Sequence, residues 1–170
     1  MKYLFCVVAA LALCCQCSVP ESQAAVEAMD LKALSLRAPL IVKGTISSSR
    51  VQWARDQRGE MIVTNHVVQV SEVLKGSMTG SDESKLTLQC LGGSIGDMKM
   101  LTAAEPSVRA GESVVLFLML EPEANSGVYK TYGGFQGKYT LLGNRVREAR
   151  NRDWTDFRSE VLSYIASKKK

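Results

Sequence analysis

The sequence contains few of the side chains that most often hold metals or transfer protons. It has one histidine, His66, among 170 residues. Only Cys90 lies in the body of the chain, because the other four cysteines fall near the N-terminus: Cys6, Cys14, Cys15 and Cys17. Neither His66 nor Cys90 has carboxylates at the spacing of a metal site. We therefore expect no metal centre and no cofactor.

Long apolar runs are also absent, except for one at the start of the chain. After Lys2, the run from Tyr3 to Cys15 is too short to cross a bilayer, which takes roughly 17 to 25 apolar residues. One basic residue, an apolar run and then small residues are typical of a secretory signal peptide. We predict that residues 1–24 are this peptide, cut between Ala24 and Ala25. The protein would then be secreted or periplasmic, with no membrane insertion after cleavage.

A strong charge of either sign is missing. The formal net charge is +4, and residues 138–170 carry nine Lys or Arg against four Asp or Glu. In this basic segment the acids are interspersed among the arginines, and no set of aromatic side chains that could stack on bases accompanies them. We therefore expect no nucleic-acid partner.

The remaining chain has the size of one domain, residues 25–170, and strand patterns predominate in it. An apolar segment that stops before Pro39 predicts a short helix over residues 29–37. Glycines between residues 133 and 137 suggest the bends of a small barrel over residues 39–142. Apolar residues at helical spacing predict a closing amphipathic helix over residues 153–167. The predicted fold class is mainly β, a small antiparallel β-barrel with a helix at each end.

Individual strands can be placed from β-branched and alternating apolar runs. They are expected over residues 40–51, 60–76 and 85–91, with two short strands after residue 127. The run from Val114 to Leu120 is apolar at nearly every position, which predicts a strand covered on both faces.

Gly92, Ser94 and Gly96 form a G-x-S-x-G pattern, the signature of a hydrolase nucleophile elbow. That elbow needs a histidine base, which in this class of enzyme follows the serine, whereas His66 precedes Ser94. It also belongs to a fold of alternating strands and helices. We therefore interpret the glycines as turn residues and expect no catalytic residues and no enzyme. The remaining enzyme hypothesis is a polar cluster of distant residues, such as Asp97, Glu112 and His66.

Several short motifs occur in an order that resembles a family of small bacterial secreted domains. The order is V-K-G-T-I at residues 42–46, V-L-K-G at 73–76, G-G-x-x-G at 92–96, G-E at 111–112 before an apolar strand, and Q-G-K at 136–138. The resemblance covers residues 29–166. Some members of that family occur beside secreted metalloprotease domains, which makes a secreted protease one candidate partner.

The V-K-G and G-E elements are also similar to the netrin-like module of the tissue inhibitors of metalloproteinases. That resemblance implies an OB-like, netrin-like barrel. In those inhibitors a first cysteine of a C-x-C motif binds the protease's zinc through its amino group and carbonyl. A cut after Cys14 would expose Cys15 and Cys17 in this spacing. The resemblance thus implies an alternative function, inhibition of a metalloprotease through an N-terminal cysteine.

The function that the sequence favours is binding without catalysis. A secreted β-barrel can bind through a strand face or through the loops at one end. We expect the partner to be another protein or an envelope component. Exposed aromatic residues near the glycine-rich turns, Tyr132 and Phe135, are the candidate binding residues, although both also fit a place in the core. No pattern in the sequence indicates the oligomeric state.

Overall fold

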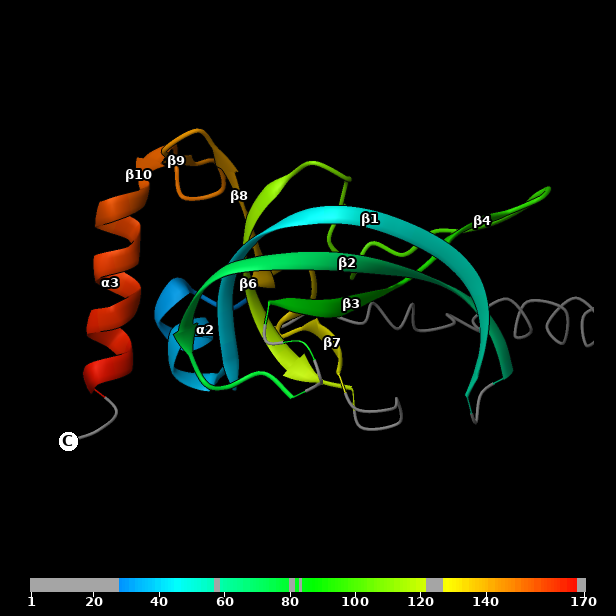
Figure 1. The fold of residues 1–170 in the computed structure, drawn as a ribbon, viewed down its shortest axis with the longest axis horizontal. Helices are drawn as coiled ribbons and strands as arrows, with labels where there is room; N and C mark the ends of the chain where they lie inside the picture. The colour runs from blue at the N-terminus through cyan, green and yellow to red at the C-terminus, as the bar shows by residue number, and fades with distance from the viewer. Residues whose placement is uncertain (1–27, 57–58, 80–81, 83, 122–126, 168–170) are drawn as a thin grey trace, which may run out of the picture.

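A computed structural model describes residues 28–56, 59–79, 82, 84–121 and 127–167. Strands make up most of this part of the chain, and helices are found near its two ends. The short helix α2 spans Leu31–Arg37, and the longer α3 spans Trp154–Ser167 (Figure 1). The expectation of a mainly β protein with two flanking helices is confirmed.

Two long strands begin the sheet, β1 (Leu40–Asp56) and β2 (Gly59–Lys75). They pair antiparallel along their whole length, with register shifts between Ile41 and Val42, Lys43 and Gly44, and Ile46 and Ser48. Figure 1 shows the two strands curving side by side away from the helices. The sequence predicted both strands but ended the first at Val51, because the exposed residues beyond it lack a strong strand pattern.

The other strands connect β2 back to β1. In this path β2 pairs with β3 (Lys85–Leu91), β3 with β7 (Val128–Thr131), and β7 with β6 (Ser113–Leu120), which pairs with β1. All of these pairings are antiparallel except that between β3 and β7, which is parallel. The expectation of a purely antiparallel sheet is therefore wrong at this one junction, where strands distant in sequence meet.

One side of these strands encloses a first apolar core. Val42, Ile46 and Val68 contribute to it from β1 and β2, and Leu88 and Leu116 from β3 and β6. Each side chain of this kind stabilises the fold by roughly 1.5 to 3 kcal/mol when it is fully buried. The alternation of apolar residues along the strands places them all on the same side.

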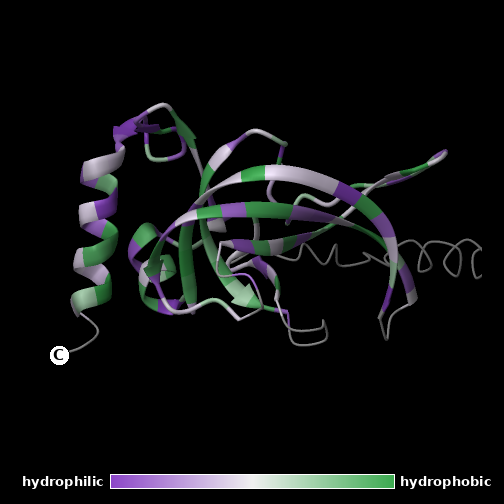
Figure 2. Ribbon diagram, in the orientation of Figure 1, coloured by the Kyte–Doolittle hydropathy of each residue, from purple (hydrophilic) through white to green (hydrophobic). Residues whose placement is uncertain are grey.

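A second apolar core lies on the other face of β6. Val115 and Phe117 point to it, whereas Val114, Leu116 and Leu118 point to the first core. The strand is therefore buried on both faces, as its continuous apolar run predicted, and it is coloured hydrophobic along most of its length in Figure 2.

The helices cover the second core together with β8 (Lys138–Leu142). Phe157 of α3 is fully buried, and its ring packs at a tilt against that of Tyr139 of β8, with the ring centroids 4.9 Å apart. Asp30 caps α2 by accepting a hydrogen bond from the backbone N–H of Ala33, so this helix begins at Leu31 rather than at residue 29. Asp153 accepts from the N–H of Thr155 in the same way, and α3 begins at Trp154.

Four short strands were not expected from the sequence. Strands β4 (Gly93–Ile95) and β5 (Met98–Met100) form a separate hairpin. Strands β9 (Arg145–Val146) and β10 (Arg152–Asp153) extend the main sheet beyond β8 and lead into α3. All four are three residues or shorter, too short for a period-2 pattern to be recognised.

Candidate functional site

A buried ion pair lies at the end of the first core, where β8 and the connection before β6 meet. Lys138 is at an inward position of β8, opposite Leu116 of β6, and is 6% exposed. Its ammonium group donates to the Glu112 carboxylate at 2.6 Å and to the carbonyl of Ser107. Burial would raise the pKa of Glu112, but the Lys138 hydrogen bond and the N–H of Arg109 outweigh it and lower that pKa. Lys138 thus joins residues 101–112 to β8.

His66 lies on β2, facing the same core. Burial, and then the positive charge of Lys138, lower the pKa of its imidazole, while Glu112 acts in the opposite direction. Its Nδ1 is 2.7 Å from the Oγ of Ser49 on β1. A histidine with a lowered pKa is neutral at pH 7, so the ring is held as a neutral hydrogen-bonding group.

Two more titratable residues, Cys90 and Glu105, lie near this end of the first core. Burial raises the pKa of the Cys90 thiol to about 12, and Glu105 adds to the effect. Burial also raises the pKa of Glu105, whose buried Oε2 has no hydrogen-bond partner in the described part of the chain. A thiol with so high a pKa is not an effective nucleophile at neutral pH. Within this cluster, the hydrogen bonds that hold residues 101–112 come from Lys138 to Ser107 and Glu112.

An open pocket of about 500 Å³ lies beside the cluster, with Arg109, Glu112, Thr140 and Arg147 in its wall. Arg147 donates to the Oγ1 of Thr140 at 3.0 Å and to the Glu148 carboxylate at 2.9 Å. Since Glu112 is paired with Lys138, most of the charge in the pocket is already neutralised. We assign no ligand to it.

Ser94 lies in a β-hairpin instead of the strand-to-helix turn that a nucleophile elbow requires. It is exposed on β4 and pairs with Lys99 of β5. The hydroxyl that approaches His66 belongs to Ser49, 2.7 Å from the imidazole.

The glycines around Ser94 are required by close packing. Gly93 has φ 140°, and a Cβ there would come within 2.7 Å of a Val51 methyl group and 2.8 Å of the Thr64 hydroxyl. Gly93 thus allows the hairpin to lie directly against β1 and β2.

The structure separates the three residues of the hypothetical polar cluster. His66 and Glu112 are both close enough to Lys138 for their pKa values to respond to its charge. Asp97 is exposed at the turn between β4 and β5. Sequence reasoning missed Lys138, because no local pattern marks a buried lysine; only its pairing with β6 places it inside.

Tyr132 and Phe135, the candidate binding residues from the sequence, lie in different surroundings. Tyr132 packs against the second core, beside the helices, which corresponds to its core interpretation. Phe135 is 49% exposed, and its backbone N–H donates to the carbonyl of Ala104. The cysteines of the inhibitor hypothesis, Cys15 and Cys17, lie outside the described residues, as does the expected signal peptide.

A different surface concentrates exposed apolar side chains. We call β1 from residue 47 and β2 up to residue 67 the arm; it lies at the end of the molecule away from the helices (Figure 1). The distal surface comprises the exposed apolar residues of the arm, of the end of β3, and of the β4–β5 hairpin and the residue after it: Val51, Trp53, Leu91, Met98 and Leu101. Trp53 is 45% exposed, Met98 58% and Leu101 79%. The sequence analysis did not identify the distal surface, because it ended the first strand at Val51 and did not predict the β4–β5 hairpin.

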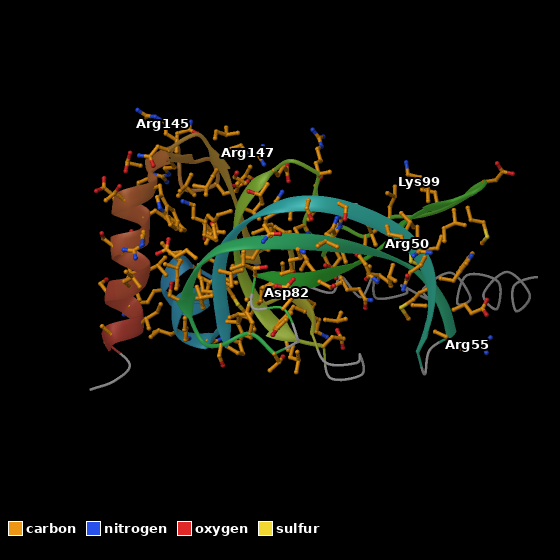
Figure 3. All side chains as sticks on the ribbon, viewed as in Figure 1. Arg50, Arg55, Asp82, Lys99, Arg145 and Arg147 are labelled. Carbon is orange, nitrogen blue, oxygen red and sulfur yellow. The ribbon has the colours of Figure 1, made fainter. Side chains whose placement is uncertain are left out.

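Basic side chains flank the distal surface. Figure 3 shows Arg50 on the arm and Lys99 on the hairpin at the same end of the molecule. Neither belongs to an ion pair within the described residues, whereas Arg55 is 2.9 Å from Glu60. The surface therefore combines Trp53, Met98 and Arg50, and these residue types are enriched in protein interfaces.

Over the residues that the structure describes, no group of three or more His, Cys, Asp or Glu side chains could hold a metal ion. No helix in the same ranges combines the length and the apolar character of a membrane span. In comparisons with known proteins, no family model and no curated sequence matches the chain.

Proposed function

We propose that this protein is a secreted, non-catalytic binding module, built on an OB-like β-barrel of netrin-like type, that binds another protein through its distal surface. The arm and the β4–β5 hairpin present this surface, and the helices lie at the other end. The buried polar cluster has a structural role in this proposal, because it fixes the connection that leads into β6.

The order of strand pairing supports an OB-like barrel. The path from β1 through β2, β3, β7 and β6 returns to β1, so five strands form a continuous ring of hydrogen-bonded neighbours. A five-stranded barrel of this kind binds ligands on the face of its second and third strands and on the loops beside it. The arm and the β4–β5 hairpin extend from these strands, which favours this end as the binding end.

The observation that carries the proposal is the exposure of Trp53, Met98 and Leu101 on neighbouring elements. Trp is enriched among the side chains that contribute most to binding, and Met is enriched in interfaces. A gathering of large apolar side chains with a polar rim marks an interaction site more often than an ordinary surface. Leaving these side chains in water forgoes their hydrophobic stabilisation, which a bound partner would supply.

A photo-crosslinking residue in place of Met98 tests the proposal in the native host. We expect a covalent adduct with a partner protein, and we expect excess purified wild-type protein to compete it away. The doubly substituted Trp53→Ser, Leu101→Ser protein should compete at least tenfold less well. The matched control carries the crosslinker at Leu142, which is similarly exposed but lies on β8. Equal adducts at both positions, or none at Met98, would contradict the proposal.

A further inference from the structure

We infer that the free edge of the arm binds an extended, acidic segment of the partner protein as an added antiparallel strand. The inference rests on the proposed binding function and specifies its mode and the chemistry of the partner. Strand addition supplies affinity through main-chain hydrogen bonds and specificity through alternate side chains.

One edge of the arm is unpaired within the described residues. β1 pairs with β6 only from Leu40 to Thr45, and the N–H and carbonyl of Ile46 bond Glu112 and Gly111. From Ser47 onward β1 has β2 on one side, and no described strand pairs with its other side. Residues 47–53 are all exposed. A free edge of this length, without proline, is a template for pairing with another strand.

The backbone groups that face this edge can be assigned. The carbonyl of Ile62 accepts from Gly92, so the backbone groups of Ile62 point away from β1. Since successive residues of a strand direct their groups to opposite edges, those of Val63 point to its partner Gln52. The N–H and carbonyl groups of Val51 and Trp53, which alternate with those of Gln52, are therefore directed to the free edge.

Side chains on the arm indicate the pattern of the added strand. Val51 and Trp53 share one face of the arm with Thr64 and Ile62, their cross-strand partners. Arg50 lies on the opposite face and is in no ion pair within the described residues. A strand that alternates apolar and acidic residues would place its apolar side chains beside Val51 and Trp53 and a carboxylate beside Arg50. Such opposite-charge and apolar cross-strand contacts stabilise a sheet.

The charges of the arm disfavour the most obvious alternative, a second copy of this chain. A symmetric pairing of two arms would bring the Arg50 side chains of both copies onto one short ribbon, and neither has an acidic partner among the described residues. Like charges at close cross-strand positions are destabilising. An acidic strand would give Arg50 a carboxylate partner, so charge complementarity points to a different protein.

The probe is a fluorescent, end-capped ten-residue peptide in which valine and glutamate alternate. We expect the purified chain to bind it, with an affinity that weakens as salt is added. Opposite residues share a face, and in an antiparallel pair every second opposite pair exchanges hydrogen bonds. The valines would lie opposite Val51 and Trp53, whose backbone groups face the free edge, so the N–H groups of the valines would point to the arm. N-methylation of the valines should weaken binding at least tenfold, whereas N-methylation of the glutamates should leave it within about twofold. Equal effects of the two modifications would overturn the inference.

A substitution in the chain tests the same bonds from the other side. Val51→Pro removes one edge-facing N–H and keeps the groups that bond β2, a position at which edge strands tolerate proline. We expect about tenfold weaker peptide binding than in the control Val51→Ala, which retains the N–H. Circular dichroism should show both variants folded. If Val51→Pro does not fold, the two N-methylated peptides still decide the question with the wild-type chain.

The outcomes separate this inference from the proposed function. If the Met98 crosslink forms but the peptide does not bind, or binds Val51→Pro and Val51→Ala equally, strand addition is wrong and the binding module remains. If the Met98 crosslink is absent as well, both fail. Tighter binding of a ten-nucleotide oligothymidylate than of the peptide would overturn the inference in favour of a nucleic-acid partner. A concentration-dependent dimer that excludes the peptide would overturn it in favour of self-association.

Discussion

The ammonium group of Lys138 lies 2.6 Å from a carboxylate oxygen of Glu112, and the side chains of the two residues are 5% and 20% exposed. Glu112→Gln leaves the more deeply buried charge without a counter-ion, so we expect it to lower the free energy of unfolding by about 3 kcal/mol. Lys138→Met should cost less, because the remaining carboxylate can reach water. Urea denaturation of the single and double variants measures both effects.

The control for this prediction is an exposed pair of the same chemistry. Arg55 and Glu60 are also ion-paired, but their side chains are 75% and 62% exposed. Glu60→Gln should change the free energy of unfolding by less than about 0.5 kcal/mol. Comparable losses for Glu60→Gln and Glu112→Gln would mean that burial does not determine the strength of the inner pair.

The lowered pKa of His66 predicts a pH-dependent stability. The folded protein binds its proton less readily than the unfolded chain, whose histidine titrates near 6.5. The unfolded state therefore takes up more protons as the pH falls, and the contribution of neutral His66 is complete above pH 6.5 and is lost below it. Unfolding midpoints of the wild type and His66→Gln between pH 5 and 7.5 test this prediction. The difference in stability between them should shrink or reverse at the acidic end, and parallel pH curves would contradict it.

Close packing at Gly93 predicts a large effect from one added methyl group. Its φ of 140° is unfavourable for any other residue, and a Cβ would meet Val51 and Thr64 below 3 Å. We expect Gly93→Ala to lower the free energy of unfolding by about 3 kcal/mol. The matched control is Gly96→Ala, which has φ 57° and open space around the new Cβ, and should cost about 1 kcal/mol. Thermal unfolding distinguishes the two, and equal losses would show that hairpin packing is unimportant.

The two functional hypotheses from the sequence predict different N-termini. We expect intact-protein mass spectrometry to give a chain that starts at Ala25. Such a chain retains one thiol, Cys90, which is buried and has a raised pKa. A thiol reagent should therefore react with it only after unfolding. A start at Cys15 would instead favour the metalloprotease inhibitor.

Local patterns in the sequence were sufficient for much of the fold. The alternation in β2 and the continuous apolar run in β6 located those strands, because side chains on a strand alternate between its faces. The cap of the last helix was one of two residues that the sequence offered, Asp153 or Thr155, and Asp153 does cap α3. These features depend on neighbouring residues, so one short window contains the information.

The proposed binding surface was less accessible to the same reasoning. Val51 and Trp53 alternate with Gln52 and Ala54, and this weak signal could have extended the predicted strand into the arm. Whether Trp53 is exposed depends on which distant elements pack against it, and a local pattern does not show this. Tyr132, which the sequence offered as a candidate binding residue, is packed against the second core.

The sequence by itself determined the mainly β character of the described chain, the places of its long strands and its two helices. Only the tertiary structure decided that β3 and β7 pair in parallel, that Lys138 lies buried against Glu112, and that no described strand pairs with the outer edge of β1 beyond Ile46. Each of these facts depends on which distant segments become neighbours. Strand pairing is fixed by the combined burial of many side chains, and the local periodicity of one segment does not specify its partner.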